Sequence, residues 1–74
     1  MVTYYSEKII NIAIRELGEL GKIIFYAKCR ELKIEPENIV VQHLVTLSEV
    51  IPKSFRPYIS DEKIKSIADE IANL

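Results

Sequence analysis

The chain is poor in the residues that usually build catalytic and metal sites. Its 74 residues include one cysteine, one histidine, two glycines and no tryptophan. A disulfide within the chain is excluded, and Cys29 and His43 supply too few ligands for a structural zinc site. Domains of this size usually need a disulfide, a metal or a partner for stability. Because the first two are missing, we expect burial against a partner.

The sequence also lacks a strong net charge and a long apolar run. The formal net charge is −1, so no overall field directs the chain towards nucleic acid or an anionic membrane. The longest stretch without a charged residue covers residues 38–48, which is too short to span a bilayer. The first residues show no signal peptide. Together with the unpaired cysteine, these features predict a cytoplasmic protein without a membrane segment.

The clearest pattern that is present is helical periodicity over residues 5–32. Apolar residues recur there at spacings of three and four, as on one side of a helix. Gly18 and Gly21 interrupt the segment, and each costs about 1 kcal/mol inside a helix relative to alanine. Because the apolar pattern keeps its phase across the glycines, we expect one long helix. The alternative is two helices with a break at Gly18–Gly21.

Further helices are expected after breaks that contain proline. Pro36 suits the first turn of a helix over residues 36–51, where its missing N–H is tolerated. A loop is expected over residues 53–59. Ser60 is a suitable N-cap for a last helix that continues to the C-terminus. The sequence therefore predicts a single all-α domain over residues 1–74, a small bundle of three helices, or four if the first helix breaks.

Two pairs of side chains could carry chemistry. Cys29 and His43 are the only candidates for a cysteine–histidine pair, but a buried structural cysteine is commoner than a reactive one. Glu16 and Glu19 could approach a metal, but Arg15 is spaced to form an ordinary ion pair with Glu19. No glycine-rich phosphate loop is present. We expect no catalytic residue, no metal, no cofactor and no small-molecule substrate, and therefore no enzyme.

The strongest functional signal is the breadth of the apolar surface over residues 5–32. Apolar side chains surround most of the expected helix at residues 9–14 and again at 23–27, whereas a surface helix in a monomer needs one stripe. We therefore predict a non-enzymatic interaction protein. It would be a small accessory or adaptor subunit that self-associates, with a homodimer favoured, or docks on a larger complex. The expected interface residues are Ile10, Ile14, Leu17, Gly21, Ile24 and Phe25.

The alternative function is association with nucleic acid, as a regulator or replication accessory factor. The candidate contacts are Lys28, Arg30, Lys33, Lys53 and Arg56, which would form one basic patch if the loop folds near the end of the first helix. A helix-turn-helix reader is not supported, because acidic residues on the last helix would oppose phosphate binding. Cations placed favourably at a helix C-terminus explain the same residues without a ligand.

Overall fold

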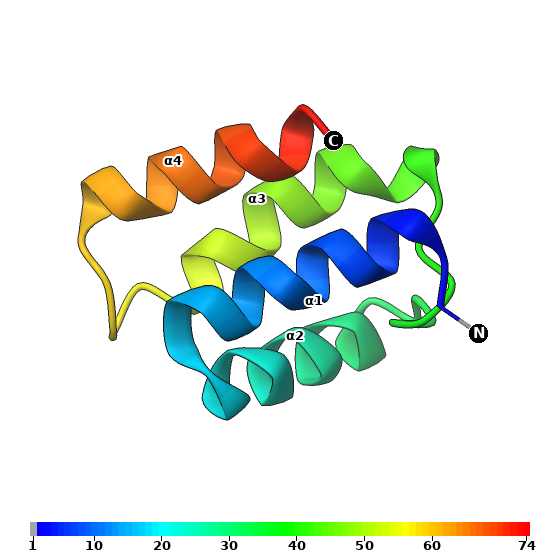
Figure 1. Cartoon of the computed structure of the whole chain (residues 1–74), viewed down its shortest axis with the longest axis horizontal. Coiled ribbons are helices and arrows are strands. Elements are labelled where there is room, and N and C mark those ends of the chain that lie inside the picture. Colours follow the sequence, from blue (N-terminus) through cyan, green and yellow to red (C-terminus); the bar gives the residue numbers. More distant parts are fainter. Residues whose placement is uncertain (1) are drawn as a thin grey trace.

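The computed structural model describes residues 2–74, and these form helices and connecting segments without a strand. The helices are α1 (Tyr4–Leu17), α2 (Glu19–Glu31), α3 (Leu44–Ser54) and α4 (Asp61–Ala72), and a 3-10 helix, η1 (Val41–His43), precedes α3. Helices α1 and α2 form one hairpin and α3 and α4 another (Figure 1). The prediction of an all-α bundle is confirmed.

The long helix expected over residues 5–32 is interrupted at Gly18. The backbone there has φ 62° and ψ −141°, a combination that is essentially restricted to glycine. The N–H of Gly18 closes α1 by donating to the carbonyl oxygen of Ile14 at 2.7 Å, and α2 then returns along α1 (Figure 1). The prediction of one continuous helix is wrong. The apolar pattern kept its phase because each half uses its apolar side against the other.

Gly21 allows α1 and α2 to approach closely. A Cβ atom at this position would overlap the backbone carbonyl group of Ala13. The backbone that approaches the glycine therefore belongs to the same chain. Gly21 is buried and Phe25 is fully buried in the chain's own core, so their assignment to a partner interface is wrong.

The second predicted helix begins and ends later than expected. Residues 36–40 form a turn and an extended segment, and α3 begins only at Leu44. The extended backbone at Val40 suits the β-branched residues around it, which resist helix formation. Pro52 lies inside α3, which continues to Ser54 instead of stopping before the proline.

A hydrogen-bond network attaches this extended segment to the start of α1. Thr3 is the N-cap of α1, and its hydroxyl oxygen accepts from the N–H of Ser6 at 3.2 Å. The Thr3 hydroxyl donates to the carbonyl oxygen of Ile39 at 2.7 Å, and the Ser6 hydroxyl oxygen accepts from the N–H of Ile39 at 2.8 Å. The N-terminal turn of α1 therefore fixes the position from which η1 and α3 begin.

The last helix agrees with its prediction. Ser60 is the N-cap of α4, and its hydroxyl oxygen accepts from the N–H of Lys63 at 3.2 Å. Helix α4 buries Ile64, Ile67 and Ile71 against the bundle. No helix within residues 2–74 has both the length and the apolar character needed to cross a membrane.

The α-helices share one core, and each of them contributes fully buried residues to it. The largest are Ile9, Phe25, Ile39, Leu47, Ile51, Phe55, Ile67 and Ile71. The chain exposes 4667 Å². A typical folded monomer of this mass exposes about 4,650 Å². Because α2 folds back on α1, the chain exposes about as much total surface as an ordinary monomer of its mass.

Candidate protein-interaction surface

The residues considered for catalysis are not arranged as an activated pair. Cys29 is fully buried, and burial raises the pKa of its thiol to about 11, which suppresses the nucleophilic thiolate. The Nδ1 atom of His43 accepts a hydrogen bond from the N–H of Val40 at 3.1 Å. Among the described residues, no group of three or more His, Cys, Asp or Glu side chains is placed to hold a metal ion.

The ion pair expected between Arg15 and Glu19 does not form, because the break at Gly18 places them on different helices. Arg15 instead donates to both carboxylate oxygens of Glu70 on α4, at 2.8 and 2.8 Å. Its hydrogen bonds hold the pKa of the Glu70 carboxyl below the ordinary value. Glu19 is left without an ion-pair partner within residues 2–74.

One side of α2 faces away from the core and forms a surface that we name the α2 outer face. It consists of Glu19, Lys22, Ile23, Tyr26, Ala27 and Arg30, which border a shallow hollow of about 280 Å³. Tyr26 is half-buried and also packs against the core, so only part of its ring is open to this face. Ile23 is 60% exposed, and Leu20 beside this face is 40% exposed. Both side chains are therefore accessible from the solvent.

The two ends of the α2 outer face carry opposite charges. Glu19 lies in the first turn of α2 and Arg30 in its last turn, and both are exposed. Arg30, like Glu19, has no ion-pair partner among the described residues. Between them, the hydroxyl of Tyr26 donates to the Glu37 carboxylate at 3.4 Å, and the Lys22 ammonium lies 5.8 Å from the Tyr26 ring centroid.

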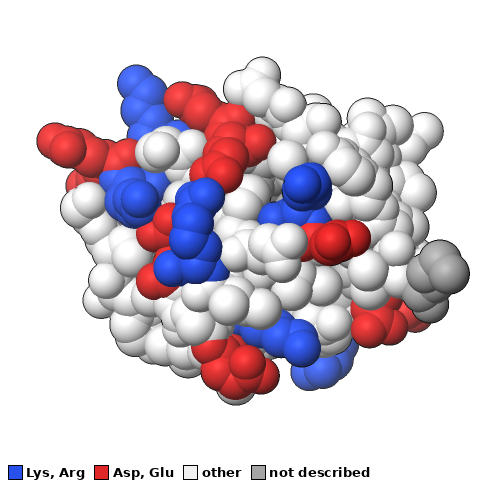
Figure 2. Space-filling model, in the orientation of Figure 1, with Lys and Arg blue, Asp and Glu red and all other residues white. Residues whose placement is uncertain are grey.

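A second apolar surface lies at the end of the bundle where α3 begins. We name it the valine surface; it consists of Val40, Val41 and Val45, which are 43%, 56% and 72% exposed. They belong to the uncharged stretch of residues 38–48. Figure 2 shows a continuous uncharged area at this end of the molecule, over the start of α3 and the end of α4. The network of Thr3 and Ser6 anchors the segment that leads into this surface.

The remaining interface residues predicted from the sequence are only partly available. Ile14 is 41% exposed at the side of α1. The others pack against the core and are half-buried: Ile10, Leu17 and Ile24. The most exposed apolar residue of α2, Ile23, was not among the predicted contacts. The helix break is the signal that would have found it. Once α2 folds back on α1, the side of α2 that carries Gly21 and Phe25 packs inwards, and Ile23 faces outwards.

The five basic residues considered for nucleic-acid contact do not line one site. Lys28 and Lys53 border the same hollow of about 280 Å³ between α2 and α3. Arg30 and Lys33 border a different hollow of about 440 Å³ at the end of α2. Arg56, in the turn that follows α3, borders neither hollow.

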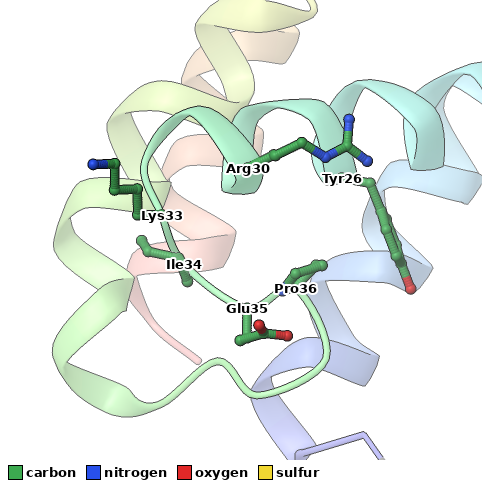
Figure 3. A pocket seen from close by; sticks show the side chains of 6 residues that line it. All are labelled: Tyr26, Arg30, Lys33, Ile34, Glu35 and Pro36. Atoms are coloured by element: carbon green, nitrogen blue, oxygen red, sulfur yellow. The ribbon is translucent and has the colours of Figure 1, made fainter.

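The larger hollow is mixed in charge. It lies between α2, which supplies Tyr26 and Arg30, and the following loop, which supplies Lys33 and Glu35 (Figure 3). Arg30 extends towards Tyr26, whereas the ammonium group of Lys33 points away from the other lining side chains (Figure 3). Glu35 brings a carboxylate to the same hollow. This arrangement does not concentrate positive charge as a phosphate site requires.

Comparison with known proteins adds no assignment. No protein-family model, curated protein or solved structure matches this chain. The chemistry of the exposed surfaces is therefore the basis on which a function is proposed.

Proposed function

We propose that this chain is a non-enzymatic interaction protein, a small accessory or adaptor subunit that self-associates through the α2 outer face. The observation that carries the proposal is the 60% exposure of Ile23 at the centre of this face. Burying an isoleucine side chain completely contributes about 1.5–3 kcal/mol. Charged residues surround this apolar centre at Glu19, Lys22 and Arg30, which matches the apolar core and polar rim of protein interfaces.

The valine surface supports the adaptor part of the proposal. Two of its three residues, Val41 and Val45, are more than half exposed. It lies at the start of α3, on different elements from the α2 outer face. Two separate apolar surfaces would allow one chain to contact a second copy and a larger protein at the same time. The unpaired Cys29 thiol is consistent with action in a reducing compartment such as the cytoplasm.

The first test is the molar mass of the protein in solution, measured by light scattering across a tenfold range of concentration. We expect a mass of twice the 8.5 kDa chain at the upper end of the range. Ile23→Asp should give the monomer mass, because it places a charge at the centre of the face. Ser66→Asp introduces the same charge at an exposed position of α4 and should leave the dimer intact. A wild-type monomer at every concentration would contradict self-association.

The alternative function, binding of nucleic acid, is favoured by one observation, the shared hollow of Lys28 and Lys53. Titration with duplex and single-stranded DNA at two salt concentrations tests it. Binding through these cations must weaken steeply as salt rises, and Lys28→Gln with Lys53→Gln must reduce it at low salt. Absence of binding at low salt removes this function.

A further inference from the structure

Four residues of the α2 outer face are spaced in a pattern that reads the same from either end. Glu19, Ile23, Tyr26 and Arg30 follow each other at intervals of four, three and four residues. This spacing places them in one line along the helix, as in the contact line of a helix pair. The remaining members of the face obey the same symmetry, because Lys22 and Ala27 are equally far from the midpoint between residues 24 and 25.

We propose that α2 pairs in an antiparallel orientation with α2 of a second copy, about a two-fold axis through this midpoint. The inference rests on the proposed function and specifies its partner. In this arrangement Glu19 of one protomer lies beside Arg30 of its partner, and the reverse pair forms at the other end. Ile23 of each protomer packs beside Tyr26 of the other.

Charge complementarity selects both the second copy and the orientation. Glu19 and Arg30 stand 11 residues apart, about 16 Å along the helix axis, and neither has an ion partner among the described residues. An antiparallel pair joins the two unlike charges twice. A parallel pair would place like charges together at both ends and would be disfavoured. Opposite Lys22 the symmetry places Ala27, so no second cation faces that ammonium group.

The size of the contact sets the expected strength. Helix α2 has 13 residues and is therefore about 20 Å long. A standard stable interface buries roughly 800 Å² on each partner. That is about a sixth of the 4667 Å² that this chain exposes. The six residues of the α2 outer face bury less than this, so we expect a weak dimer, with a dissociation constant of about one micromolar or higher. We do not assign the second copy to the valine surface, because Val40, Val41 and Val45 carry no charges that would fix the relative orientation of two protomers.

Charge reversal on the full chain tests the pairing. Glu19→Arg alone and Arg30→Glu alone should each weaken dimerisation by at least about tenfold, because each creates two like-charge contacts in a symmetric dimer. The double variant restores two unlike pairs and should return the dissociation constant to within about threefold of the wild type. The measurement is sedimentation equilibrium over a concentration series that begins below the wild-type dissociation constant, with helix content and melting temperature checked for each variant by circular dichroism.

Two controls separate this pairing from effects of net charge and helix stability. Glu62→Arg reverses an acid in the first turn of α4, and Lys53→Glu reverses a base in the last turn of α3. They match the two test variants in charge and in position within a helix, and they should leave dimerisation unchanged.

The outcomes distinguish the two proposals. Rescue by the double variant supports the antiparallel α2 pair. A dimer that ignores the single reversals, or that the double variant fails to restore, overturns this pairing but leaves self-association standing through another surface. A wild-type protein that is monomeric at every concentration overturns both.

Discussion

Replacement of Gly21 by alanine should destabilise the protein, although the same change usually stabilises a helix. In an exposed helix interior, alanine is favoured over glycine by about 1 kcal/mol. Here the added methyl group would overlap the backbone of Ala13, and it would also lie 3.2 Å from the Cβ atom of Leu17. A backbone group cannot rotate away as a flexible side chain does, so α1 and α2 must separate.

The cost of this separation exceeds the gain in helix propensity. Overpacking of a well-filled core typically costs 1–3 kcal/mol. A gap of 0.5–1 Å already removes about a quarter to a half of the dispersion attraction between facing atoms. Fully buried Phe25 lies one helical turn from Gly21, so its contacts would be weakened when α2 moves outwards. Because the overlap is with backbone atoms, we expect an overpacking cost in the upper part of this range, about 2–3 kcal/mol. After the helix-propensity gain of about 1 kcal/mol, Gly21→Ala should lower the free energy of unfolding by about 1–2 kcal/mol and the melting temperature by roughly 5–15 °C.

Thermal and urea unfolding followed by circular dichroism measure this change. Protein concentration must be equal for both proteins, because dimerisation would shift the apparent stability. A Gly21→Ala variant as stable as the wild type, or more stable, would refute the close approach of α1 and α2. It would also favour the continuous helix that the spacing of apolar residues suggests.

Three further predictions concern single residues. Ser6→Ala should lower the free energy of unfolding, measured in urea, by about 1–3 kcal/mol, because it leaves the buried N–H of Ile39 without an acceptor. The control Ser66→Ala, at an exposed helix position, should change it by less than about 0.5 kcal/mol. Equal effects of the two variants would contradict the hydrogen-bond network of Ser6. Lys33→Gly should raise the free energy of unfolding by about 0.5–1 kcal/mol, because Lys33 has φ 59°, a left-handed backbone conformation that glycine adopts at lower cost than lysine. A loss of stability in urea would refute this. Cys29 should react with a thiol reagent only after unfolding. Its folded pKa of about 11 exceeds the ordinary value of about 8.5, so the stability that it contributes is complete below pH 8.5 and declines as pH rises towards 11. Cys29→Ala should reduce this decline, and the raised pKa of the half-buried Tyr26 adds a decline of the same sign that the variant keeps.

Local sequence signals predicted the elements whose ends depend on nearby residues. Ser60 caps α4 as expected because an N-cap hydrogen bond reaches only to the first turn of the same helix. The cap of α1 is equally local, since Thr3 bonds the N–H of Ser6 three residues on. The start of α3 was predicted incorrectly, because the segment before it is held by hydrogen bonds between the backbone of Ile39 and the side chains of Thr3 and Ser6, more than 30 residues earlier in the sequence.

The interface residues predicted from the sequence differ from the residues of the α2 outer face. The excess of apolar side chains in the first 32 residues did indicate a helix that is covered on more than one side. Much of that cover comes from the same chain, since Gly21 and Phe25 pack internally. What remains outside is Ile23, between the unpaired charges of Glu19 and Arg30. The apolar period shows which residues share a side of a helix. Which side is buried depends on where the helix ends and on what then packs against it.

Composition and periodicity by themselves determined that this protein is an all-α domain, because apolar spacing of three and four residues can be buried only on helices. They also placed Gly18 at a possible break. Only the tertiary structure decided that the chain reverses there. The reversal is stable if packing α1 against α2 contributes more free energy than the backbone hydrogen bonds that a continuous helix would keep. The close contact at Gly21 is part of that gain, and it exists only after the chain has turned back. The same reversal directed Phe25 into the core and Ile23 to the surface.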